Sequence, residues 1–319
     1  MSEPTSIVPG PLESTDVRPK IRRRIVLPVC LFYLTCLSTF WAGSTGQPII
    51  YIQDSLNEAS LMPIRAVLGQ NWHLGLSYMA AILGILFAHE MGHFLATLKY
   101  RIPASLPFFL PLPISMIGTI GAVIGMDGRR ANRKEIFDIG IAGPLAGLVV
   151  ALPVMWYGVT HLELHTENGE GSMVLGMPLL VQWMIALGGP ADVPAGGIPL
   201  GHLFGNPFFL AGWVGLLITG LNMLPASQLD GGHVLYCVFG RAARHIARVF
   251  ILAAIGFILS DIQHNQIWIL MTVLVLFMGV THPPTKDDSV DIGWFRRILG
   301  VVSLTIPLLC FPPNAIQAL

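Results

Sequence analysis

One stretch constrains the fold more than any other. It is the apolar run Gly75–Leu98, 24 residues long, whose only acidic or basic side chains are His89, Glu90 and His93, arranged as HExxH. In a helix, residues four apart lie about 40° apart around the axis and about 6 Å apart along it, so two such histidines can bind one metal ion. Glu90 is close enough to hold a water molecule beside that ion. A helix of this length is about 36 Å long and can cross a hydrocarbon core of roughly 30 Å.

The apolar surroundings give the short motif its weight. HExxH fixes only three residues and occurs by chance in many chains. A charged side chain at the bilayer centre costs about 2.5–3.5 kcal/mol on insertion scales, and such residues are usually functional. Three ionisable groups within five residues therefore indicate one shared metal ion, here predicted to lie inside a transmembrane helix.

The composition indicates an integral membrane protein. Of the 319 residues, 53% are hydrophobic and 11% are charged, against about 25% charged in soluble domains. The mean hydropathy is +0.67. The basic residues form short clusters between apolar spans, which gives nucleic-acid binding no support. Cys30, Cys36, Cys237 and Cys310 lie in or beside apolar stretches without a CxxC pair, so we expect neither a disulfide nor a thiolate metal site.

The expected fold is an all-α polytopic membrane protein of about seven transmembrane helices. A basic cytosolic tail, 1–24, precedes a single transmembrane domain, 25–319, whose core is about 75–240. A signal peptide is the competing interpretation of the first apolar run, but its 19 residues are long for that role and favour an uncleaved anchor. The predicted spans are Ile25–Gly43, Gly75–Leu98, Ile136–Tyr157, Leu203–Leu229, Val249–Leu259, Ile267–Val280 and Ile298–Phe311.

The distribution of basic residues predicts the orientation. With the N-terminus in the cytosol, 17 of the 18 Lys and Arg residues fall on the cytosolic side, and only Arg65 lies outside. Segment 158–205 has no Lys or Arg and is expected to be extracytoplasmic. Its apolar part, Met173–Leu187, is expected to lie at the interface as a helix, because a crossing there would move six basic residues outside.

A proline-rich and glycine-containing region follows the HExxH helix. Three prolines within Leu106–Pro113 exclude a regular helix. Ile114–Gly125 is apolar but has only 12 residues, too few to span, and predicts strands or a re-entrant hairpin beside the metal. Such backbone is tolerated at membrane depth only where protein or a water-filled cavity shields it.

Two further groups of ionisable residues are given structural interpretations. His161, Glu163, His165 and Glu167 could form a second metal site, but a solvated acidic loop is favoured. Asp138, near the start of a predicted span, is interpreted as an interfacial carboxylate. Gly140, Gly143 and Gly147 in that span allow close helix packing.

A catalytic zinc usually has three protein ligands and an open position. The candidate for the third ligand is Asp230, which follows the 27-residue run Leu203–Leu229 that has no ionisable group. Pro225 should break the helix in that run, and Gly231 and Gly232 allow a tight turn beside a ligand. A broken membrane helix normally marks a buried or cavity-lining site.

HExxH in one transmembrane helix and NxxPxxxLDGGH, from Asn222 to His233, in a later one resemble the site-2 protease family of intramembrane zinc metalloproteases. The resemblance covers about Ala80 to Gly240, including Gly118–Gly121 and the run Phe137–Gly147. It implies that His89, His93 and Asp230 bind one Zn²⁺, that Glu90 is the catalytic carboxylate, and that Asn222 holds the substrate or the oxyanion. His233 could be a fourth ligand, but a hydrogen-bonding role behind the ligands is favoured. The PDZ domain of some family members is not evident.

The resemblance also implies a substrate and a location. We expect cleavage within the transmembrane segment of a single-span protein, already trimmed by another protease, in a bacterial cytoplasmic membrane. The segment must unwind before attack, and Ile114–Gly125 could pair with it as an added strand. A membrane metal transporter and a non-cleaving relative are the alternatives. A transporter usually distributes ligands along a path and has internal repeats, and a non-cleaving relative would lack Glu90 or a ligand. The oligomeric state is left open.

Overall fold

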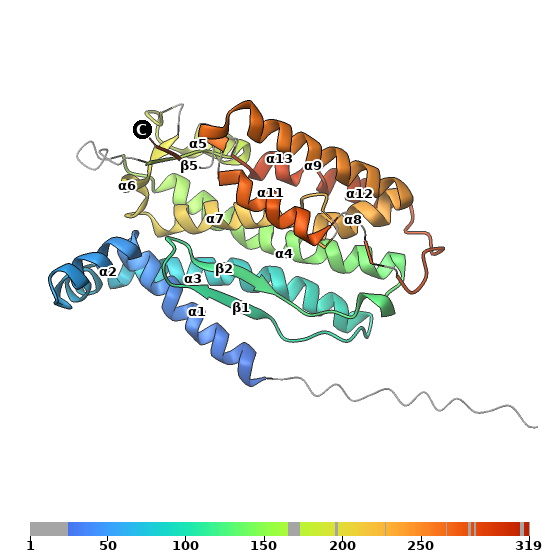
Figure 1. The fold of residues 1–319 in the computed structure, drawn as a ribbon, viewed down its shortest axis with the longest axis horizontal. Coiled ribbons are helices and arrows are strands. Elements are labelled where there is room, and N and C mark those ends of the chain that lie inside the picture. The colour runs from blue at the N-terminus through green and yellow to red at the C-terminus, as the bar shows by residue number, and fades with distance from the viewer. Residues whose placement is uncertain are drawn as a thin grey trace, which may run out of the picture.

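The computed structural model describes residues 25–164, 173–194, 197–226, 228–265, 267–279, 282–283, 285–312 and 316–318. The basic tail 1–24, His165 and Glu167 lie outside these residues. The described part is mostly helical, and its long helices run side by side (Figure 1).

The HExxH helix is α3, Met62–Lys99, which has 38 residues and begins 13 residues before the predicted span. Pro63 in its first turn suits the start of a helix, where the backbone N–H has no helical partner. At about 57 Å, α3 is longer than a hydrocarbon core is thick. Helix α1, Val26–Thr45, packs along α3, and α2, Pro48–Asn57, connects the two.

Helix α4, Arg133–Thr160, is the central helix, since it packs against α3, α7 and α8. A capping box fixes its start: the Asn132 side chain accepts the Glu135 N–H at 3.0 Å, and the Glu135 carboxylate accepts the Asn132 N–H at 2.9 Å. The helix therefore begins three residues before the predicted span Ile136–Tyr157, and its Gly143 and Gly147 lie against the histidines of α3.

A β-hairpin follows α3, as predicted, but it begins earlier. Strand β1, Phe108–Leu112, pairs antiparallel with β2, Gly118–Val123, so the proline-rich segment supplies the first strand. The pairing shifts between Leu110 and Pro111, where proline is tolerated because the ladder is already interrupted. Gly121 has φ +128°, a conformation that favours glycine. The hairpin packs mainly on α1 (Figure 1).

The apolar run 203–229 is not one helix. Helix α7, Pro207–Asn222, ends three residues before Pro225, and α8, Asp230–Phe239, begins directly after the run. The predicted break is therefore confirmed. It leaves Asn222 on the last turn of one helix and Asp230 on the first turn of the next.

Among the described residues, four helical stretches are long and apolar enough to cross a membrane: Val26–Thr45, Met62–Lys99, Arg133–Thr160 and Asp230–Ser260. The last one includes α8, the 3-10 turn Gly240–Ala242 and α9, Ala243–Ser260, so the predicted span Val249–Leu259 is only its end. Shorter helices occupy the other predicted spans: α11, Ile267–Met278, and α12 and α13, Trp294–Ser303 and Ile306–Cys310. Helix α10, Ile262–Asn265, links α9 to α11. Seven spans therefore remain a prediction.

The predicted extracytoplasmic segment contains more strand than expected. Strands β3, Met173–Leu175, β4, Ile198–Pro199, and β5, Ile316–Ala318, form a three-stranded sheet in the order β4-β3-β5. The expected helix over 173–187 therefore begins only at Leu179, as α5, Leu179–Gly188, after Pro178. Helix α6, Leu200–Leu203, leads into α7. At about 15 Å, α5 is too short to cross a hydrocarbon core.

Candidate metal centre

Three side chains that the sequence separates by up to 141 residues meet at one point. The Oδ2 atom of Asp230 lies 3.2 Å from Nε2 of His89 and 3.2 Å from Nε2 of His93, and the two Nε2 atoms are 3.2 Å apart. Two ligands of a tetrahedral zinc with bonds of about 2.0–2.1 Å lie about 3.3–3.4 Å apart. These three residues therefore fit a zinc ion. They are the group that could hold a metal among the residues that the structure describes.

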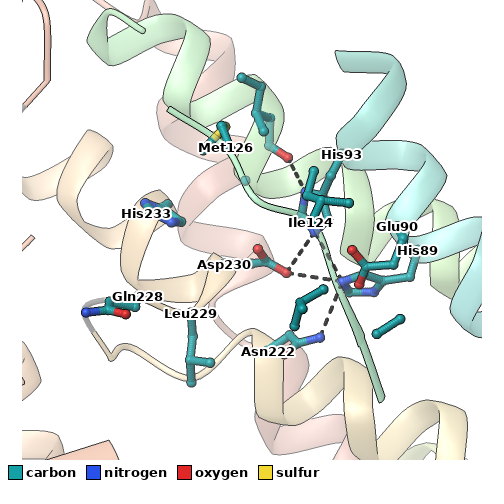
Figure 2. A pocket seen from close by; sticks show the side chains of 14 residues that line it. His89, Glu90, His93, Ile124, Met126, Asn222, Gln228, Leu229, Asp230 and His233 are labelled. Atoms are coloured by element: carbon teal, nitrogen blue, oxygen red, sulfur yellow. Dashed lines mark hydrogen bonds and ion pairs between the residues drawn. The ribbon is translucent and has the colours of Figure 1, made fainter. Parts of the chain in front are cut away.

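The helices explain why the three groups converge. His89 and His93 lie one turn apart on α3, and both are buried. Asp230 approaches from the first turn of α8, across the space between the helices (Figure 2). Two histidines and one carboxylate leave one position of a tetrahedral ion open, as catalytic zinc sites do.

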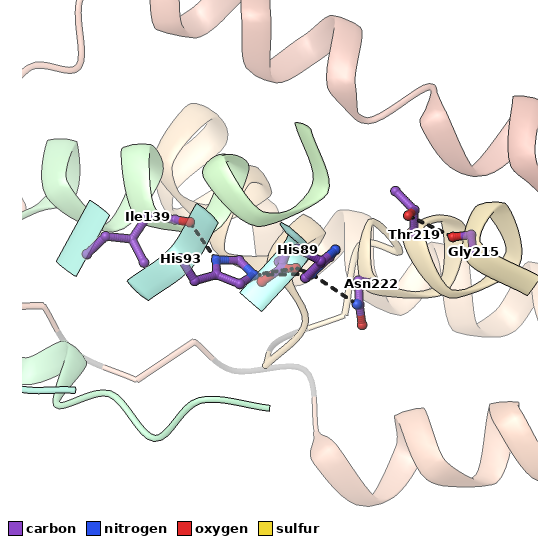
Figure 3. A network of polar contacts seen from close by, with 7 residues as sticks. His89, His93, Ile139, Gly215, Thr219 and Asn222 are labelled. Carbon is purple, nitrogen blue, oxygen red and sulfur yellow. Dashed lines mark hydrogen bonds and ion pairs between the residues drawn. The ribbon is translucent and has the colours of Figure 1, made fainter. Parts of the chain in front are cut away.

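A backbone carbonyl orients the His93 imidazole, and the Asn222 amide lies beside His89 (Figure 3). The Ile139 carbonyl of α4 lies 2.7 Å from Nδ1 of His93 and can only accept, so Nδ1 carries the proton and Nε2 presents its lone pair to the ligand group. Nδ2 of Asn222 lies 3.3 Å from Nε2 of His89. Ile139 was not among the predicted site residues. It contributes its backbone carbonyl, which every residue has, so the side-chain pattern of the sequence does not reveal it.

Glycines of α4 make the space for these rings. A Cβ atom at Gly143 would lie 2.0 Å from Nε2 of His93, and one at Gly147 would lie 3.1 Å from Nδ1 of His89. A carbon atom at 2.0 Å is well inside van der Waals contact. The small residues that predict close helix packing therefore also shape the metal site, a second role that spacing alone does not reveal.

The three candidate ligands line a cavity of about 320 Å³. Glu90, which is 5% exposed, lines it next to His89, and Asn222 lines it from the end of α7 (Figure 2). The hairpin lines another side with residues at and after the end of β2, including Ala122, Val123 and Ile124. The structure thus brings the predicted catalytic carboxylate, the predicted amide and the predicted strand to one cavity.

The other candidates lie outside the ligand group. His233 lines the same cavity, and its Nδ1 lies 2.7 Å from Nε2 of His282, a residue that the sequence patterns do not single out. Asp138, which the sequence suggested was an interfacial carboxylate, forms an ion pair with Arg296 at 2.6 Å. The pair links α4 to α12. His161 is exposed and contacts the Tyr157 carbonyl at 3.0 Å, consistent with the loop interpretation.

The comparisons with known proteins agree with this geometry. The model of peptidase family M50 matches residues 77–260, which include all three ligand candidates and both halves of the broken helix. The chain belongs to peptidase family M50. It is 28% identical over 310 residues, 94% of this chain, to the probable zinc metalloprotease EGY1, chloroplastic, of Oryza sativa subsp. japonica. It is 30% identical over 73% of its length to the probable zinc metalloprotease EGY2, chloroplastic, of Arabidopsis thaliana.

The M50 membership confirms the resemblance to the site-2 protease family. His89, His93 and Asp230 form a candidate group for a metal ion. This chain covers 52% of the rice relative and 40% of the Arabidopsis relative. The chain thus spans about half or less of the length of these curated relatives.

Proposed function

We propose that this M50 member is an intramembrane zinc metalloendopeptidase that hydrolyses peptide bonds within transmembrane segments of other membrane proteins. One observation carries the proposal. Three ligand atoms lie within 3.2 Å of one another. Two belong to His89 and His93 inside the long apolar helix α3, and the third belongs to Asp230 at the start of α8. Two ligand candidates within a helix that is long and apolar enough to span a membrane support cleavage of a peptide bond inside the membrane.

The residues divide the chemistry among them. His89, His93 and Asp230 hold the zinc, which, when bound, polarises a carbonyl and acidifies water. Glu90 lines the same cavity, orients the attacking water as general base and returns the proton to the leaving amine. The Asn222 amide, 3.3 Å from the His89 Nε2 atom, donates to the oxygen on which negative charge develops.

The hairpin is suited to bind an unwound substrate. A helical segment has its peptide groups in internal hydrogen bonds, so it must unwind locally and its freed groups need new partners. Residues at and after the end of β2 line the metal cavity, and β1 is the paired strand in this two-stranded sheet. We propose that β2 accepts the substrate as an added strand.

The surroundings of the enzyme are part of the proposal. We propose seven spans, with the N-terminus in the cytosol of a bacterium and segment 158–205 on the outer side of the cytoplasmic membrane. The substrate is a single-span protein trimmed first by another protease. A transporter or a non-cleaving relative has less support, because the ligands converge on one point and Glu90 lines the cavity beside them.

The test uses purified protein and a synthetic single-span peptide as reporter. His93→Ala should lose bound zinc, measured by elemental analysis. Glu90→Gln should keep zinc and lose cleavage by about 10²–10⁴-fold, since it removes general acid–base catalysis alone. Full zinc content in His93→Ala, or wild-type cleavage by Glu90→Gln, would contradict the assignment.

A further inference from the structure

The cavity holds a third imidazole that the mechanism above does not use. His233 lies one turn after Asp230 on α8 and lines the metal cavity to one side of the ligands (Figure 2). It is not part of the group that could hold a metal among the described residues. Its Nδ1 atom lies 2.7 Å from Nε2 of His282, which precedes α12 and lies outside the part that the M50 model matches.

The contacts of His282 determine where its proton is. Its Nδ1 atom lies 2.6 Å from the carbonyl oxygen of Pro283, which can only accept, so Nδ1 carries the proton. Burial lowers the pKa of His282 below its ordinary value, which keeps the ring neutral near pH 7. A neutral imidazole has one donor and one acceptor, so Nε2 of His282 is an acceptor.

The same logic then fixes His233. Because Nε2 of His282 accepts, Nδ1 of His233 must be the donor across the 2.7 Å contact. Neutral His233 is left with an unprotonated Nε2, an acceptor on a residue that lines the cavity. The arrangement parallels His93, whose Nδ1 donates to the Ile139 carbonyl so that Nε2 presents a lone pair.

His282 and the nearby residues 286–288 contact α8 and the start of α4. The Tyr236 ring stacks on His282 with centroids 4.2 Å apart, and its hydroxyl donates to Asp288 at 2.7 Å. Two backbone bonds tie the segment to the start of α4, from Lys286 to Ala131 at 2.9 Å and from Arg133 to Asp287 at 3.1 Å. These contacts fix the plane of the His282 ring and its distance from α8.

We propose that His282 is a positioning residue that holds His233 as an acceptor for a backbone N–H of the unwound substrate. The proposal rests on the proposed function and adds a second anchoring point for the substrate, separate from β2. The acceptor selects for an N–H group, since a substrate carbonyl would find no donor there. An N–H released from a helix in apolar surroundings needs such a partner, because leaving it unpaired is costly.

The first test reads the tautomer directly. Zinc-loaded protein with ¹⁵N-labelled histidine is examined by NMR, and the His233 signals are assigned by their loss in His233→Gln. The expected signature is a protonated Nδ1 and a bare Nε2. In His282→Phe this preference should disappear, and in His282→Gln, whose side-chain oxygen can accept, it should return. A protonated Nε2 on His233 in the wild-type protein would overturn the inference.

The second test measures binding of the same synthetic peptide to the Glu90→Gln protein. His282→Phe in that background should weaken binding about tenfold, the loss expected for one hydrogen bond, with zinc content unchanged. His282→Gln should bind within about twofold of the parent. Wild-type affinity in His282→Phe would overturn the anchoring role. If the Glu90→Gln parent itself binds no peptide, the proposed function fails, while the NMR result still decides the tautomer.

His161→Phe is the matched control for both tests. His161 also stacks on a tyrosine, Tyr157, with centroids 4.1 Å apart, and its Nδ1 also bonds a backbone carbonyl. It is exposed and does not line the cavity. His161→Phe should change neither the His233 signals nor the peptide affinity. If it changed them as much as His282→Phe does, the effect would come from a general loss of structure and not from the contact with His233.

Discussion

At the scale of single residues, the missing side chain of Gly143 leaves room for the His93 ring. A Cβ atom there would lie 2.0 Å from the His93 Nε2 atom, so Gly143→Ala must displace a predicted zinc ligand. We expect this variant to fold, to lose most of its bound zinc and to lose cleavage with it. Zinc content by elemental analysis, with thermal unfolding in detergent beside it, checks the prediction.

The matched control for that change is Gly84→Ala on α3. A Cβ atom at Gly84 meets nothing within 4 Å, and alanine is the better helix former by about 0.5–1 kcal/mol. Gly84→Ala should therefore keep its zinc and unfold at an equal or higher temperature. Equal zinc content in the two variants would show that α4 does not set the position of His93.

At the scale of elements, the hairpin predicts an asymmetry between neighbouring proline variants. Successive N–H groups of a strand point to opposite edges, so of Ala122→Pro and Val123→Pro only one removes an N–H that faces away from β1. That variant should fold, keep its zinc and lose peptide cleavage, while the other should lower the unfolding temperature. Wild-type cleavage by two well-folded variants would end the strand-addition proposal.

Gly121 in the same strand is not an informative position for a proline substitution. The Gly121 N–H donates to the Thr119 hydroxyl oxygen at 3.0 Å, and the φ of +128° at Gly121 is incompatible with the fixed negative φ of proline. A proline there would break the irregular pairing itself. Loss of activity in Gly121→Pro would therefore say nothing about substrate pairing, so the test uses Ala122 and Val123.

A second prediction at this scale concerns the attachment of α12. Arg296 forms a two-pronged, partly buried pair with Asp138 of α4, with contacts of 2.6 and 2.9 Å. Burial raises the pKa of Tyr100 to about 12, so its neutral phenol donates to the same carboxylate. Arg296→Leu should lower stability by about 1–2 kcal/mol, because a half-buried carboxylate loses its charged partner.

Arg297→Leu is the control for that change, one residue away. Its pair with Asp291 at 2.7 Å is exposed, with side-chain exposed fractions of 60% and 68%. Exposed pairs contribute about 0–1 kcal/mol, so Arg297→Leu should leave the unfolding temperature nearly unchanged. If the two leucine variants lowered the unfolding temperature equally, the prediction that the Asp138–Arg296 pair stabilises the fold more than the exposed pair would be wrong.

At the scale of the whole molecule, the packing places the sites that test the orientation. Arg133 at the start of α4 donates to the Cys237 carbonyl near the end of α8 at 2.9 Å, so these two ends lie together. The far end of α4 meets α5, where a Cβ at Gly188 would lie 2.8 Å from Trp156. Cysteines at positions 130 and 244 should therefore react from one side of the membrane, and a cysteine at 192 from the other.

The labelling uses a background in which the exposed Cys30 is replaced by serine. In membrane vesicles of known orientation, an impermeant maleimide should reach positions 130 and 244 only from the cytosolic side. Position 192 should react only from the opposite side. Reaction of position 192 from the cytosolic side would overturn the proposed orientation, which depends on the charge count and not on the packing.

Sequence alone determined the parts of this protein that depend on local rules. Helical spacing paired His89 with His93, the cost of charge in an apolar run pointed to Asp230, and Pro225 broke the helix between Asn222 and Asp230. These inferences need only backbone geometry and the chemistry of single side chains over a few neighbours. The family resemblance rested on the same residues and was confirmed.

Only the tertiary structure decided what depends on contacts between distant residues. It set the 3.2 Å spacing of the ligand atoms, the role of Gly143 and the Ile139 carbonyl, and the chain from Pro283 through His282 to His233. It also moved the hairpin start to Phe108, because an irregular pairing accommodates Pro111. Such features arise where two distant segments pack together. The free energy of that packing depends on both segments, so neither segment's sequence predicts it alone.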